Sequence, residues 1–362
     1  MLLMFIMLPL LILCCLSDRQ HKIWILIAVT FLFLFFIFVI GLRDSNYGLD
    51  IVTYYGIFND PSYYILDEKG LYFLNYVLKI ISDEYVFFAI SYSVILNSLL
   101  LLLYRCFSKE LFLLYFALTL SSFIFFQINF NIYRQGLAVI LVLLAMYCAF
   151  KGDIFLSIFI VIVAFCFHKA SIIGFFLIAI SFFNIKFKPG YAYVALFSSI
   201  VTFHDSVFLY ITNVLVELFP LYANSITEYV RLTGSDIIQS SSFNHRNIPL
   251  MVSLLFYAVY YNPVALDSDG LMNRFSDKVA TISCFILFIS SLFTSNVLLY
   301  DRIIIFCQLL SPVLTVSVLG IFFKRESKTR IAILFICILQ LVFTLLIWGP
   351  RNFIPEYEFL SL

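Results

Sequence analysis

The sequence predicts an all-α protein, a polytopic transmembrane helical bundle of about 12 spans. Of its 362 residues, 63% are hydrophobic and only 12% are charged, and the mean hydropathy is +1.06. A soluble domain carries roughly 25% charged residues, so a chain this apolar must be dissolved mainly in lipid. Its length accommodates about a dozen helices of roughly 20 residues together with their loops.

Apolar runs separated by short polar turns give the position of each expected span. The first eight are expected at Leu2–Leu16, Ile23–Leu42, Tyr85–Tyr104, Leu111–Gln127, Gln135–Phe150, Ile154–Phe167, Ser171–Phe183 and Tyr191–Phe203. Four more are expected at Pro249–Leu266, Lys278–Leu298, Ile303–Phe323 and Ile331–Trp348. The runs Leu71–Ile81 and Val207–Phe219 are too short to cross, and we expect each to lie in the interface or to re-enter.

The charge distribution predicts the orientation of the bundle. Placing the SDRQHK turn at 17–22 in the cytoplasm puts thirteen basic and seven acidic residues on that side, and nine basic and fourteen acidic residues outside. This agrees with the positive-inside rule. Residues 1–362 are expected to form a single integral membrane domain with outer loops at about 43–84 and 204–248. These loops are too small for an independent catalytic domain, so any chemistry must be done by loops packed on the bundle.

Several function classes are excluded by what the sequence lacks. The eight cysteines show no metal-ligand spacing, and we expect neither a metal site nor disulfides. No Walker, GxGxxG, HExxH or GxSxG motif occurs where it could act. The net charge of +1 argues against a nucleic-acid partner. We therefore expect no cofactor and a substrate that arrives already activated.

The stretch LRDSNYGLDIVTYYGIFND at 42–60 carries the first candidate site residues. Arg43 and Asp50 flank a turn at the expected bilayer edge, where charged groups are costly and mark function. Asp50 and Tyr54 are one helical turn apart and share a face. The alternative interpretation is a helix end followed by a solvated turn, with the tyrosines in the aromatic belt.

The next candidates stand at the ends of later helices. Glu68 precedes an amphipathic segment expected to lie flat on the outer surface, where it either favours the helix N-terminus or takes part in catalysis. Arg134 and Gln135 stand at the mouth of an uncharged span. Arg134 presents a fixed cation with five donors, or it snorkels to lipid phosphate.

The apolar run 154–183 is interrupted by His168 and Lys169, with Ser171 beside them. Ionisable groups at membrane depth are functional-site candidates by default, and His168 could act as a general base or donate a hydrogen bond to an anion. The run forms either two short spans broken at HKAS or one re-entrant hairpin. Arg246, in the second outer loop, and Arg302, at an outer turn beside Asp301, are weaker candidate cations.

The order of these motifs resembles that of a known family. The pattern R-x4-G-x-D-x3-Y at Arg43, Gly48, Asp50 and Tyr54 resembles the signature of EpsG-like members of the Wzy polysaccharide polymerases. Glu68, the N-x-x-R-Q element at Asn131–Gln135 and the H-K-x-S element at His168–Ser171 agree with it. The sequence departs from the family in having Gly136 after the middle element and Ile172 after the last.

The resemblance implies a GT-C-like, metal-independent membrane glycosyltransferase without a cofactor. It would polymerise undecaprenyl-pyrophosphate-linked oligosaccharide units at the outer face of a bacterial inner membrane, making O-antigen, capsule or exopolysaccharide. Its partners would be the lipid-linked donor and acceptor, membrane lipids and a chain-length regulator.

The resemblance also suggests a role for each candidate residue. Arginines suit a pyrophosphate leaving group, and a base must deprotonate the acceptor. The expected pyrophosphate ligands are Arg43, Arg134, Arg246 and Arg302. The candidate bases are His168, Asp50 and Glu68, which the sequence does not rank. The other expected substrate contacts are Tyr54, Gln135, Lys169 and Ser171.

Three other functions are weighed against a polymerase. An O-antigen-type ligase would use similar phosphate-binding residues but normally has a larger outer loop. A lipid-linked oligosaccharide flippase would carry charges along a path through the bundle, whereas the charges here cluster at the outer edge. A membrane-bound acyltransferase would draw its donor from the cytoplasm, although the candidate residues face outward.

Overall fold

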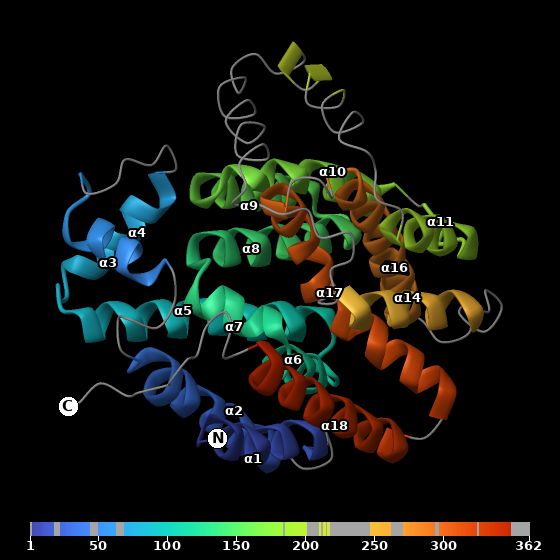
Figure 1. Cartoon of the computed structure of the whole chain (residues 1–362), viewed down its shortest axis with the longest axis horizontal. Coiled ribbons are helices and arrows are strands. Elements are labelled where there is room, and N and C mark those ends of the chain that lie inside the picture. Colours follow the sequence, from blue (N-terminus) through green and yellow to red (C-terminus); the bar gives the residue numbers. More distant parts are fainter. Residues whose placement is uncertain are drawn as a thin grey trace. The chain divides into compact units, whose positions relative to one another are not determined.

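The computed structural model confirms an all-α protein (Figure 1). It describes residues 2–17, 22–43, 50–62, 69–183, 185–200, 210, 213–214, 216–217, 247–261, 271–293, 297–323 and 326–348, and the regular elements in these ranges are all helical. The chain divides into two compact units, one of Met1–Phe183 with Leu319–Leu362 and one of Asn184–Val318. Each unit is described by itself below.

Long apolar helices confirm a helical membrane protein. Five helices in the described ranges are long and apolar enough to cross a bilayer, at Lys22–Gly41, Tyr85–Phe107, Tyr133–Phe150, Tyr300–Phe323 and Glu326–Leu346. They correspond to α2 (Lys22–Phe35) with the π-helical turn η1 (Phe36–Gly41), α5 (Tyr85–Phe107), α8 (Tyr133–Phe150), α17 (Val297–Phe323) and α18 (Glu326–Phe343) with the turn η5 (Thr344–Trp348). The count of about twelve spans and the GT-C-like architecture stay predictions.

The expected single span Leu111–Gln127 is instead broken into α6 (Phe112–Leu120) and α7 (Phe123–Phe130), bent by 77°. The break falls at the pair Ser121 and Ser122. Their hydroxyls donate to the carbonyls of Leu118 at 3.1 Å and Thr119 at 2.6 Å, and such bonds compete with the helical ladder. The predicted element Asn131–Gln135 joins the end of α7 to the start of α8.

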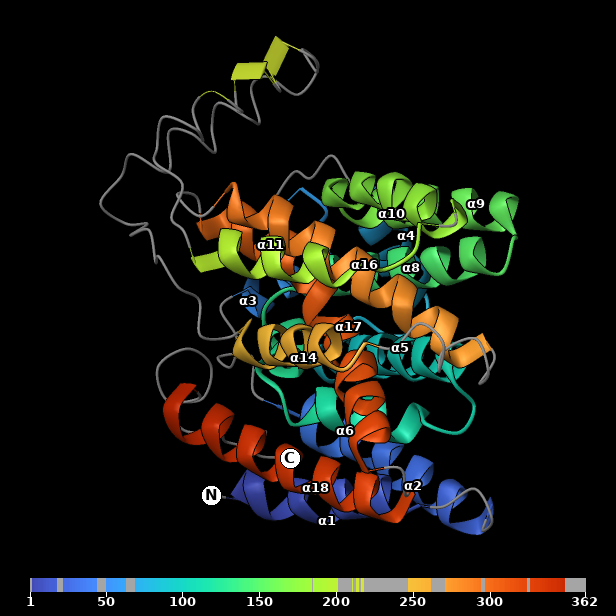
Figure 2. The same cartoon turned by 90° about the vertical axis from the view of Figure 1, so that its right-hand side faces the viewer.

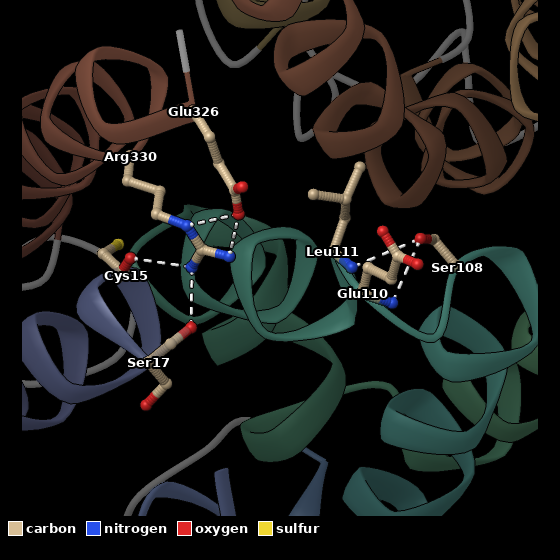
Figure 3. A network of polar contacts seen from close by, with 7 residues as sticks. All are labelled: Cys15, Ser17, Ser108, Glu110, Leu111, Glu326 and Arg330. Carbon is tan, nitrogen blue, oxygen red and sulfur yellow. Dashed lines mark hydrogen bonds and ion pairs between the residues drawn. The ribbon is translucent and has the colours of Figure 1, made fainter. Parts of the chain in front are cut away.

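The N-terminal helix α1 (Leu2–Leu16) packs on α18, and an arginine of α18 bonds to its C-terminal end (Figure 3). Arg330 donates to the carbonyls of Cys15 at 3.2 Å and Ser17 at 2.7 Å, and it pairs with Glu326 at 2.7 Å. A cation is favourable at a helix C-terminus, where the last carbonyls lack helical partners. Arg330 thus joins the first and last helices of its unit.

A helical hairpin packs on α8 (Figure 2). Its arms are α9 (Ile154–Phe167) and α10 (Ile173–Phe182), joined by the 3₁₀ turn η2 (Lys169–Ile172). A Cβ on Gly174 of α10 would approach the side chains of Val161 in α9 and Val142 in α8 to 2.8 and 3.1 Å. The three helices therefore pack tightly together. The chain reverses at HKAS, as both expected versions of this region require.

Two short helices follow the first membrane helix, α3 (Ile51–Asn59) and α4 (Lys69–Lys79), and they pack against each other. Lys79 donates to the carbonyl of Asn59 at 2.6 Å and ties the end of α4 to the end of α3. The expected interfacial run Leu71–Ile81 is thus a separate helix. Most of the run Val207–Phe219 lies outside the described residues.

The second unit contains α11 (Pro189–Ile200), α14 (Ile248–Val259), α16 (Leu271–Ser291) and most of α17. The expected span Lys278–Leu298 is shifted, because α16 begins seven residues earlier and ends at Ser291. Its early start carries Asp277, whose carboxylate accepts from the Tyr257 hydroxyl at 2.6 Å, and Lys278, which donates to the Ile185 carbonyl at 3.1 Å. These partners allow charged residues inside the helix.

Candidate functional site

The first candidate, Arg43, follows the π-helical turn η1 and has 0% exposure. Its Nη1 donates to the carbonyl of Ile40 at 2.5 Å, so the cation lies at the C-terminal end of its own helix. Gly41 fixes this approach, because a Cβ there would lie 2.9 Å from the backbone Cα of Ile90 in α5. Arg43, expected at the bilayer edge, is therefore enclosed by protein.

The buried guanidinium of Arg43 joins the R-x4-G-x-D-x3-Y pattern to the N-x-x-R-Q element. Nη2 of Arg43 donates to the carbonyl of Asn129 at 2.8 Å and to the hydroxyl of Tyr133. Its Cζ lies 4.7 Å from the ring centroid of Phe130 and 5.4 Å from that of Tyr133. A buried charge requires such hydrogen bonds, and aromatic faces add cation–π attraction.

An amide pair holds the carbonyl that Arg43 uses. Asn97 of α5 donates to Oδ1 of Asn129 at 2.7 Å, and Asn129 donates back at 3.3 Å. Asn129 also donates to the carbonyl of Phe125 at 2.9 Å within α7. Neither asparagine was predicted from the sequence as a site residue, although an amide within an apolar run is itself a signal.

Tyr54 belongs to the same cluster, whereas Asp50, expected on the same helical face, is exposed. It is 7% exposed, and its ring centroid lies 5.8 Å from that of Tyr133. Tyr92 of α5 also packs on Tyr133, with ring centroids 5.3 Å apart. Asp50 is exposed immediately before α3, and its backbone carbonyl accepts from the Tyr54 amide at 2.9 Å.

Arg134 and Gln135 lie in the first turn of α8, next to Tyr133. Arg134 is half-buried and Gln135 is buried. Gly136 allows this turn to approach its neighbours, because a Cβ there would lie 3.1 Å from Ile128 and 3.2 Å from Leu96. A helix N-terminus with an arginine on it favours an anionic ligand.

The third motif forms the turn between α9 and α10. His168 is buried, and its Nδ1 accepts from the backbone N–H of Ala170 at 3.1 Å. This bond assigns the proton of the neutral ring to Nε2. Ser171 is 1% exposed, and Lys169 is half-buried.

Helix α4 contacts both the tyrosine cluster and the last turn of α9, which leads into the His168 turn. Its Asn75 accepts from the Tyr92 hydroxyl at 2.5 Å. At its other end, a Cβ on Gly70 would lie 2.8 Å from the backbone oxygen of Cys166 and 3.1 Å from the backbone nitrogen of Phe167. The structure thus brings parts of all three motifs around α4, α5 and α8.

The remaining predicted residues lie in the second unit or outside the described residues. Arg302 lies in the first turns of α17, in the second unit, rather than at an outer turn, because the helix begins at Val297. Glu68 and Arg246 lie outside the described residues, as does Gly48 of the first motif. Within the described ranges, no group of three or more His, Cys, Asp or Glu side chains could hold a metal ion.

Comparison with known proteins agrees with the motifs. The model of the EpsG family matches residues 2–359. This chain belongs to the EpsG family. No curated protein and no solved structure matches it. Membership confirms the resemblance and indicates an EpsG membrane protein of the polysaccharide polymerase type, with a role in polysaccharide biosynthesis.

Proposed function

We propose that this EpsG protein polymerises oligosaccharide repeat units carried on undecaprenyl pyrophosphate, at the outer face of a bacterial inner membrane. The fold would be GT-C-like with about twelve spans, and the product would be O-antigen, capsule or exopolysaccharide. A glycosyl pyrophosphate carries its own driving force, so the reaction needs no nucleotide.

The observation that carries the proposal is the convergence of separated motifs. Arg43 hydrogen-bonds to Asn129 and Tyr133, which follow it by 86 and 90 residues. Tyr54 packs on the same tyrosine. Burying the charged side chain of Arg43 in an apolar bundle costs free energy, so its burial supports a functional site rather than a surface charge.

In this proposal the two arginines have different roles. Arg43 is a positioning residue, because its guanidinium is enclosed by protein carbonyls, a hydroxyl and aromatic rings. It fixes the start of α8, where the half-buried Arg134 neutralises the pyrophosphate. Arginine suits phosphate oxygens because its donors match them in pairs.

The hydrogen bond from Ala170 to Nδ1 favours one of the two roles expected for His168. With Nδ1 occupied, the ring presents Nε2–H, so we assign His168 as a donor to the leaving pyrophosphate. Asp50 and Glu68 are then the candidate bases. The acceptor hydroxyl loses its proton to the base, its oxygen bonds to the donor's anomeric carbon, and undecaprenyl pyrophosphate leaves with the electron pair of the broken C–O bond.

The test is the length profile of surface polysaccharide in a deletion strain. If the protein is a polymerase, the deletion strain should carry single repeat units on the carrier or final acceptor. The wild-type gene should restore long chains. Missing attachment would instead indicate a ligase, and cytoplasmic accumulation a flippase. Either outcome contradicts the proposal. The same strain complemented with Arg134→Ala should make single units at normal protein levels.

A further inference from the structure

Helix α4 turns a polar residue inward and apolar residues outward. Its buried residues are Leu71, Asn75 and Leu78. Its outward side chains Phe73 and Tyr76 are 71% and 69% exposed, and Ile80, just after the helix, is 71% exposed. These side chains suit a helix in contact with lipid. The feature that lipid contact leaves unexplained is the inward asparagine.

The side-chain oxygen of Asn75 accepts a hydrogen bond that orients the amide, but its side-chain nitrogen donates none among the described residues. Oδ1 accepts from the Tyr92 hydroxyl at 2.5 Å, and Asn75 is 4% exposed. Its Nδ2 is buried and has no hydrogen-bond partner in the part of the chain that the structure describes. A buried donor without an acceptor is costly, and most buried polar groups are paired. The hydroxyl of Ser171, in η2, is likewise buried without a hydrogen-bond partner among the described residues.

The position of Asn75 relates it to the candidate site. Tyr92, which orients the amide, packs on Tyr133 with ring centroids 5.3 Å apart. Gly70, packed on the last turn of α9, lies about 7.5 Å from Asn75 along the axis of α4, from a rise of 1.5 Å per residue. The unused donor therefore lies between the two parts of the site.

We propose that Nδ2 of Asn75 donates a hydrogen bond to a saccharide oxygen of the lipid-linked substrate, when α4 moves outward to admit it. This inference rests on the proposed function. The group that bonds the amide, the Tyr92 hydroxyl, is uncharged, and such surroundings suit an uncharged sugar hydroxyl or ring oxygen. The charged phosphates are matched by the arginine at the start of α8 instead.

Asn75→Leu tests the proposal, because leucine has a similar volume and no donor. In the complemented deletion strain we expect long chains to fall roughly tenfold, the value of one or two hydrogen bonds, at an unchanged protein level. Tyr76→Phe is the matched control. It removes one polar group from the neighbouring residue on the outward face of α4, and chain length should not change.

A double variant separates substrate binding from a structural role. Asn75→Leu with Tyr92→Phe removes both partners of the internal hydrogen bond, so the purified protein should melt near the wild-type temperature while chains stay short. Wild-type chain lengths in either variant would overturn the role of Asn75. Absence of long chains in the strain carrying the wild-type gene would instead overturn the proposed function and this inference with it.

Discussion

The guanidinium of Arg43 donates to the hydroxyl of Tyr133, ninety residues further along the chain. This contact connects the end of the first long membrane helix to the first turn of α8. Because Arg134 follows directly, any displacement of Tyr133 displaces the arginine to which we assign the pyrophosphate. The pair makes the candidate site sensitive to residues that never contact substrate.

Arg43→Lys should abolish long chains although it keeps the charge. A lysine cannot reproduce the planar fork that reaches Ile40, Asn129 and Tyr133 at once. Each lost hydrogen bond to a charged group costs about 1.5–3 kcal/mol, so a lower melting temperature is expected in detergent. A lysine variant with normal stability and normal chains would contradict the positioning role.

Tyr133→Phe removes only the hydroxyl and keeps the ring contacts with Tyr54 and Tyr92. We expect a loss of about 1.5–3 kcal/mol in stability, because the lost bond is one to a charged group, and a several-fold loss of long chains, because Arg43 loses one of its acceptors. Tyr115→Phe is a suitable control, since Tyr115 is also fully buried in the same unit but lies in α6. Equal effects of the two changes would argue against a special role for Tyr133.

The sequence predicted the fold class and the motifs, but not how the motifs meet. Apolar runs and charge asymmetry depend on local composition, which is why most helices lie where they were expected. The break at Ser121 depends on hydroxyl bonds to the helix backbone and on Gln340, 219 residues away, whose side chain accepts from Ser121 at 3.0 Å. Such distant partners leave no periodic signal.

The same limit applies to the candidate site. A cation at the end of a span is expected to face headgroups, and only the fold shows that Arg43 is enclosed by α7 and α8. The orientation of the Asn75 amide likewise depends on Tyr92, 17 residues later. Local patterns thus identified residue types, whereas burial decided their roles.

His168→Gln and His168→Asn distinguish a donor from a base. The side-chain nitrogen of glutamine can replace Nε2, whereas the oxygen of asparagine can replace Nδ1 as acceptor for Ala170. If His168 donates to the leaving group, the glutamine variant should keep more polymerisation than the asparagine variant. If His168 is the base, both variants should lose it equally, as measured by chain length at matched protein levels.

Gly70→Ala tests whether the contact between α4 and the last turn of α9 matters. The added methyl group would lie 2.8–3.1 Å from backbone atoms of Cys166 and Phe167, which cannot give way as a side chain could. We expect short chains and a lower melting temperature. Gly320→Ala, in α17, meets nothing within 4 Å, so it should be neutral or stabilise by up to about 1 kcal/mol. Normal chains from Gly70→Ala would show that α4 need not pack there.

Arg330→Ala and Glu326→Gln should differ although they break the same ion pair. Arg330 also donates to the carbonyls of Cys15 and Ser17, and its side chain is 8% exposed, whereas that of Glu326 is 63% exposed. Removing the arginine leaves the end of α1 without these bonds, at about 1.5–3 kcal/mol each. Removing the exposed carboxylate should cost at most about 1 kcal/mol. Thermal unfolding of the two purified variants measures the difference, and equal losses would mean that the bonds from Arg330 to the end of α1 add nothing beyond the ion pair within α18.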